Sequence, residues 1–138
     1  MRLLTGDDPE KRIAVAQLFR RVEQGELILA APVSVIADTV YVLSSPRIYR
    51  QSRQQITSAL VPLIEMPGFR VEQKHLVLRA FDIYLQTPLD FSDAIIVASM
   101  QRADAQVLYT YDRHFDRVPG IRRTDPGQDA SGANGARP

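Results

Sequence analysis

The sequence is 138 residues long, is 45% hydrophobic and carries a formal net charge of +1. These values fit one compact domain with a real core, and they exclude a protein that holds nucleic acid through overall charge alone. The absence of cysteine excludes disulfides and thiolate metal sites, and no apolar stretch is long enough to span a bilayer. We therefore expect a soluble, cytoplasmic protein with no membrane partner.

The first half of the chain alternates between helical and strand patterns. Asp8 and Pro9 favour a helix start, and apolar residues then repeat with helical spacing up to Gly25, which predicts a helix over 9–24. The wholly apolar segment LILAA predicts a strand over 27–31 that is buried on both faces. Residues 32–44 return to a helical pattern in which Asp38 is the only charge.

The second half repeats this alternation. Ser52 and Gln55 form a capping box that predicts a helix, which ends before Pro67 and Gly68. Ile95, Ile96 and Ser99 have helical spacing and are expected to lie on the buried side of a later helix. The segments expected after the capping box are a strand at 69–71, helices over 76–87 and 91–102, and strands at 106–110 and 121–123.

Strands that alternate with helices predict an α/β fold, here a three-layer α/β/α sandwich with a mostly parallel central sheet. We expect one domain over residues 1–125. Residues 126–138 are dominated by small and polar residues, which predicts a disordered tail. In such folds, sites gather at the carboxyl ends of the strands, where Asp112 follows the segment QVLYT.

Carboxylates are the most conspicuous candidates for chemistry. The sequence has no glycine-rich phosphate loop, no zinc-type histidine spacing and no G-x-S-x-G segment. Hard divalent cations prefer oxygen ligands, so converging aspartates are typical of an Mg²⁺ site that activates water. Five aspartates stand near the start of a helix, within a helix or just after a strand: Asp38, Asp90, Asp93, Asp112 and Asp116.

Each aspartate also has a purely structural interpretation. Asp90 is well placed to cap the helix that follows it, and Asp93 in the first turn suits the helix dipole without any metal. Asp112 could simply begin a turn, and Asp116 could be a surface charge beside Arg113 or Arg117. Asp38 lies among apolar residues and should avoid burial unless it has a partner.

Two local groups of basic residues could hold RNA. The first group is Arg47, Arg50 and Arg53, in a polar connector, and the second is Arg113, His114 and Arg117 near the end of the domain. Runs of charge are more often solvated surface, and that interpretation stays open for both groups.

The segments RLLTGDDPE, LDFSDAIIVASM and LYTYDRHFDRVPGI, together with Asp38, resemble a PIN domain of the VapC toxin type over residues 2–126. The resemblance implies an Mg²⁺- or Mn²⁺-dependent ribonuclease that acts as the toxin of a type II toxin–antitoxin pair. It also implies a homodimer and an antitoxin partner. It assigns the metal ligands to Asp38, Asp93 and Asp112, and it gives supporting places to Asp90, Thr110 and Asp116.

Two departures from the family pattern keep an alternative open. The family's second acid is normally Glu, whereas this chain has the shorter Asp38. The family also begins with a strand that carries an aspartate, and this sequence begins after it, as a start site read too late would produce. A catalytically impaired module that binds an antitoxin or dimerises is the alternative. A phosphotransfer receiver is less favoured, because Lys11 and Lys74 lie in helical segments.

Overall fold

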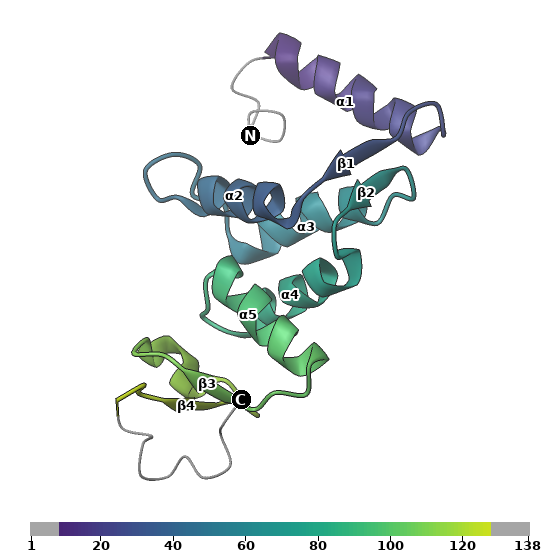
Figure 1. Cartoon of the computed structure of the whole chain (residues 1–138). Helices are drawn as coiled ribbons and strands as arrows, with labels where there is room; N and C mark the ends of the chain where they lie inside the picture. Colours follow the sequence, from purple (N-terminus) through teal and green to yellow (C-terminus); the bar gives the residue numbers. More distant parts are fainter. Residues whose placement is uncertain (1–8, 128–138) are drawn as a thin grey trace.

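The computed structural model describes residues 9–127 and shows alternating helices and strands (Figure 1). The helices are α1 (Pro9–Glu23), α2 (Val33–Ser44), α3 (Arg53–Ile64), α4 (Lys74–Gln86) and α5 (Phe91–Arg102). The strands are β1 (Leu29–Ala31), β2 (Phe69–Val71), β3 (Val107–Tyr109) and β4 (Arg122–Thr124), and a short 3-10 helix, η2 (Arg113–Arg117), lies between the last two. The α/β class predicted from the sequence is confirmed.

All four described strands are paired in parallel, as expected, but they form two separate pairs. β1 pairs with β2, with Ala30 opposite Arg70, and β3 pairs with β4, with Leu108 opposite Arg123. Figure 1 shows the two pairs at opposite ends of the described chain, with α4 and α5 between them. The described strands therefore do not make one continuous central sheet.

The prediction that the LILAA strand is buried on both faces is wrong. The strand is shorter than the apolar segment, and Ala30 is exposed while its two neighbours are half-buried. Leu29 donates its backbone N–H to Gly68, and Glu72 donates its backbone N–H to Ala31, so β2 covers only one edge of β1. Apolar composition predicted the strand correctly but not the shielding of its faces.

The core lies mainly between the helices. α4 and α5 pack most extensively against each other, and the tilted rings of Phe81 and Phe91 lie 4.5 Å apart at the centre of this contact. The prediction that Ile95, Ile96 and Ser99 form the buried side of α5 is wrong, because Ile95 is half-buried and the other two are exposed. The buried side chains of α5 are those of Phe91, Ala94, Val97, Ala98 and Met100. Small residues on this face allow α4 to approach α5 closely.

The capping box predicted at the start of α3 is confirmed. The Ser52 hydroxyl accepts the N–H of Gln55, and the Gln55 side-chain oxygen accepts the N–H of Ser52 at 2.8 Å. These reciprocal bonds satisfy two N–H groups that a helix end would otherwise leave without a partner. The disordered tail predicted over residues 126–138 lies outside the described residues, apart from its first two positions, 126 and 127.

Candidate functional site

Asp90 and Asp93 stand at the N-terminus of α5, where both line a cavity of about 730 Å³. Asp90 occupies the N-cap position, as predicted, but its side chain makes no capping hydrogen bond. Its exposed carboxylate instead contributes to the cavity wall. Asp93, one turn further on, is half-buried. Asp90 therefore has the N-cap position predicted from the sequence but not the hydrogen bond that a capping side chain would make.

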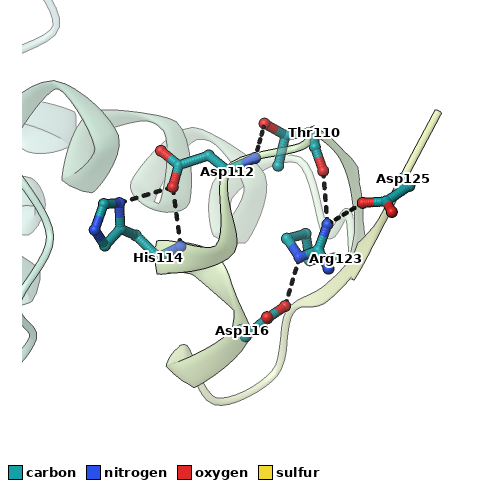
Figure 2. Close-up of polar contacts among 6 residues, drawn as sticks. All are labelled: Thr110, Asp112, His114, Asp116, Arg123 and Asp125. Atoms are coloured by element: carbon teal, nitrogen blue, oxygen red, sulfur yellow. Dashed lines mark hydrogen bonds and ion pairs between the residues drawn. The ribbon is translucent and has the colours of Figure 1, made fainter.

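Asp112 begins the η2 helix immediately after β3, as Figure 2 shows. Its Oδ1 atom accepts the backbone N–H of His114 at 2.9 Å and lies 2.7 Å from the Nδ1 atom of the same residue. The Thr110 hydroxyl accepts the N–H of Asp112 at 3.1 Å. The Asp112 side chain is thus held by the turn that it begins, and Thr110 supports that turn.

The charges of α5 and of the β3–η2 turn interact. The pKa of Asp93 is raised, first because burial disfavours its charged form and then because the carboxylates of Asp112 and Asp90 repel it. His114 acts in the opposite direction. The pKa of Asp112 is lowered, chiefly because the N–H of His114 donates to it. Asp90 and Asp112, both predicted as site residues, therefore lie within electrostatic reach of Asp93.

Asp116 belongs to a different network, on the other side of the turn (Figure 2). It accepts a hydrogen bond at 2.5 Å from the Nε atom of Arg123, whose Nη1 atom donates to the Thr110 carbonyl and to Asp125. Arg123, not Arg113 or Arg117, is therefore the cation that pairs with Asp116. The network ties β4 to the end of β3 and so stabilises the strand pair whose first strand, β3, precedes Asp112.

Asp38 is exposed on α2, so the partner expected for a buried carboxylate is not required. Its neighbours Ala37 and Tyr41 line the cavity that contains Asp90 and Asp93, which places Asp38 beside the cavity rather than within its wall. Across residues 9–127, no three side chains of the His, Asp or Glu type lie close enough to hold a metal ion together.

The second basic group predicted from the sequence is brought together on η2. Arg113, His114 and Arg117 line a hollow of about 360 Å³ with Pro88. Because His114 also contacts Asp112, this hollow adjoins the carboxylates. A cationic surface next to a candidate metal site is where a phosphate backbone would be held.

Arg53 has a structural role that the sequence did not reveal. Its guanidinium group donates to the carbonyls of Tyr84 at 2.8 Å, Leu89 at 2.6 Å and Pro88 at 3.1 Å, and it lies 4.1 Å from the centre of the Tyr84 ring. Arg53 also lines the cavity that contains Asp90 and Asp93, so its place in an RNA-binding patch stays a prediction, but its guanidinium group is not a free surface cation. The group instead fastens the α4–α5 connection, which leads directly into Asp90 and Asp93. No sequence signal links an arginine to carbonyls more than 30 positions away.

Comparison with known proteins identifies the family. The PIN-domain family model matches residues 1–121. The chain belongs to the PIN-domain family. PIN domains are generally nucleases, so this PIN domain has a nuclease-type fold, and the family predicted from the motifs is confirmed. No curated protein matches the chain. No helix within residues 9–127 combines the length and apolar character needed to cross a membrane.

PIN domains usually use divalent metal ions, and two features of this PIN domain fit such an ion. The donors are carboxylate oxygens, which Mg²⁺ and Mn²⁺ prefer, and the repulsion that Asp112 and Asp90 exert on Asp93 is of the kind that a cation relieves. Mg²⁺ commonly binds through one or two carboxylates and keeps several waters. Two carboxylates, such as those of Asp93 and Asp112, are therefore enough to serve as its protein ligands.

Proposed function

We propose that this PIN domain is an Mg²⁺- or Mn²⁺-dependent endoribonuclease that cleaves RNA phosphodiesters. The observation that carries the proposal is the electrostatic coupling of Asp93 and Asp112 in a chain of the PIN family. The two residues are far apart in the sequence and come from different elements, α5 and the β3–η2 turn. A convergence of acids of this kind is what a divalent ion requires.

In the proposed site, Asp93 and Asp112 would hold the ion, and Asp38 beside the cavity would be a further ligand residue. Asp90 adds negative charge at the cavity wall, and Thr110 holds the turn at Asp112. A bound divalent ion ionises water and neutralises charge on the phosphate. Asp116 supports the fold through Arg123 and takes no part in ligation.

The cations of η2 complete the proposed site. Arg113 and Arg117 would hold the phosphate backbone next to Asp112, and His114 fixes the orientation of the Asp112 carboxylate. Because the whole chain carries a charge of only +1, the attraction for RNA must come from this local surface. The affinity for RNA should therefore fall steeply with salt, with a slope set by these few contacts.

We also propose the biological setting implied by the motifs. The nuclease would be the toxin of a type II toxin–antitoxin pair, would act in the cytoplasm as a homodimer and would be inhibited by a cognate antitoxin. Support for this setting comes from the VapC-like segments around Asp93 and Asp112. The RNA cleaved could be a transfer, ribosomal or messenger RNA, since the same acids serve for each.

One observation favours a second candidate function. Because no group of three ligands forms within residues 9–127, a PIN-like module that binds an antitoxin or dimerises without cleaving RNA is the alternative. The two candidates differ in divalent-ion binding, which the nuclease needs and the binding module does not.

The deciding experiment compares wild-type protein with Asp93→Asn on single-stranded RNA at millimolar Mg²⁺, with and without EDTA. We expect cleavage by the wild type only, and a loss of about 100-fold or more in Asp93→Asn. Asp104→Asn is the matched control, because Asp104 is exposed at the other end of α5 and its φ of 56° suits asparagine. Absence of both cleavage and Mg²⁺ or Mn²⁺ binding by calorimetry would establish the non-catalytic module instead.

A further inference from the structure

The cavity at the N-terminus of α5 extends well beyond the carboxylates. Its walls come from α2, from the α2–α3 connection and from the first turn of α5, and Arg53 of α3 and Tyr84 of α4 also line it. Asp90 and Asp93 line the wall formed by α5, whereas Tyr41 lines the wall formed by α2. A volume of about 730 Å³ falls within the range of small-molecule sites and is much larger than a hydrated metal ion needs.

Tyr41 is the most exposed of the large hydrophobic residues within 9–127, with 77% of its surface accessible. The core does not require its ring, because α2 packs through Ile36, Val40 and Leu43. Tyr41 also lies three residues after Asp38, so the two side chains share one face of the helix. An aromatic face thus stands next to one proposed ligand residue and opposite another.

The surroundings of Tyr41 suit a planar, partly polar ligand. Ser44 and Ser45 line the cavity beside it, and Gln51 lines it from the α2–α3 connection. The backbone of this wall is held in place, since Gln51 donates its N–H to the Leu43 carbonyl at 2.9 Å. Aromatic rings that bind unpaired nucleobases do so by stacking, with hydroxyl and amide groups available to the edges of the base.

We propose that this cavity binds one unpaired nucleobase of the RNA, which stacks on Tyr41 while the adjoining phosphate lies at Asp93 and Asp112. The proposal rests on the proposed function and adds a base-binding subsite to it. The basic hollow of Arg113 and Arg117 lies on the Asp112 side, so the backbone can continue there. Because a base held in a duplex cannot enter the cavity, the site selects single-stranded RNA.

The test measures RNA binding separately from cleavage. Short single-stranded RNAs carrying 2-aminopurine at one position are titrated with Asp93→Asn protein, so that stacking is reported by fluorescence quenching and no cleavage is needed. In this background we expect Tyr41→Ala to weaken binding about 5- to 150-fold and to abolish the quenching at one position. Tyr41→Trp should retain both, because its ring stacks as well.

Val35→Ala is the matched control, because Val35 is an exposed apolar residue of α2 outside the cavity, and its loss should leave affinity unchanged. An RNA that lacks the base at the quenched position should bind the Tyr41→Ala protein as tightly as the intact RNA does, because that protein has no ring on which the base could stack. If the Tyr41→Ala protein binds the intact RNA as tightly as the protein that retains Tyr41, the subsite is overturned. If base binding is found but the wild type cleaves nothing, the nuclease proposal fails and the subsite stands.

Discussion

Asp93 and Asp112 are the same kind of residue, yet their pKa values move in opposite directions. Asp93 is half-buried and faces other carboxylates, so its charged form is disfavoured. Asp112 accepts a backbone N–H and lies near His114 and Arg123, so its charged form is favoured. As pH falls, Asp93 should therefore take up its proton before Asp112. If the proposed site binds a cation, this asymmetry means that Asp112 is already ionised without it, whereas the charged form of Asp93 is favoured by it.

At the residue scale we predict that Asp93→Asn stabilises the metal-free protein at neutral pH. Because the pKa of Asp93 is raised in the folded protein, ionisation of Asp93 lowers the free energy of unfolding only above the pKa of an unfolded aspartate. Below that pKa, the carboxyl group is protonated in both the folded and the unfolded state. The wild type therefore loses stability as pH rises through the folded-state pKa of Asp93. Asp93→Asn does not, because asparagine is neutral at every pH in this range. Melting temperatures in EDTA should agree at pH 3 and diverge by pH 7.

Saturating Mn²⁺ gives the complementary measurement for this pair. A ligand that binds only the folded state raises its stability, so the ion should increase the melting temperature of the wild type more than that of Asp93→Asn. A constant difference in melting temperature between the two proteins in EDTA from pH 3 to 7 would show that the pKa of Asp93 is not raised.

At the scale of elements, the connection between α4 and α5 determines where Asp90 and Asp93 lie. This connection is short, and Arg53 of α3 donates to two of its carbonyls, those of Pro88 and Leu89, and to the Tyr84 carbonyl in the last turn of α4. Hydrogen bonds from a charged donor are stronger than neutral ones. The N-terminus of α3 therefore positions the start of α5, although the two helices are separated by the whole of β2 and α4.

We predict that Arg53→Ala lowers the free energy of unfolding by about 1.5–3 kcal/mol, because carbonyls around Leu89 lose a charged donor. Arg53→Lys should recover little, since an ammonium group does not reproduce the planar fork. Urea unfolding measures the effect. Arg79→Ala is the control, because Arg79 makes an exposed ion pair with Asp82 and should cost less than about 1 kcal/mol. Equal losses for Arg53 and Arg79 would contradict the role of Arg53.

At the scale of the whole molecule, stability depends on the helical core rather than on the strands. The rings of Phe81, Phe91 and Tyr84 form one aromatic cluster between α4 and α5, with centroids 4.5 and 5.8 Å apart around Phe91. The described strands have three residues each, and two-stranded sheets are marginal by themselves. The packing of α4 against α5 therefore supports the site that α5 carries.

We predict that Phe81→Ala destabilises the protein by about 3–5 kcal/mol, because Phe81 is almost fully buried and its loss leaves a cavity in this cluster. Leu85→Ala is the control on the same helix, since Leu85 is 39% exposed and should cost much less. Thermal and urea unfolding monitored by circular dichroism measure both. A small loss of stability in Phe81→Ala would show that the α4–α5 contact is not the main source of the protein's stability.

Local signals in the sequence determined most of the elements and the family. The capping box at Ser52, the apolar periodicity of the helices and the β-rich run before Asp112 each act through neighbouring residues, so they can be interpreted without the fold. The choice of carboxylates as candidate ligands came from residue types and motif positions. The family predicted from those motifs is the one that the comparison found.

Only the tertiary structure decided which candidates lie together. It brings Asp93 near Asp112, leaves Asp38 beside the cavity, pairs Asp116 with Arg123 and binds Arg53 to distant carbonyls. Each outcome depends on how helices and strands pack across long stretches of chain, and hydrogen bonds or charges between such stretches leave no periodic trace in the sequence. Spacing along a chain predicts which residues share a face, whereas packing determines what that face meets.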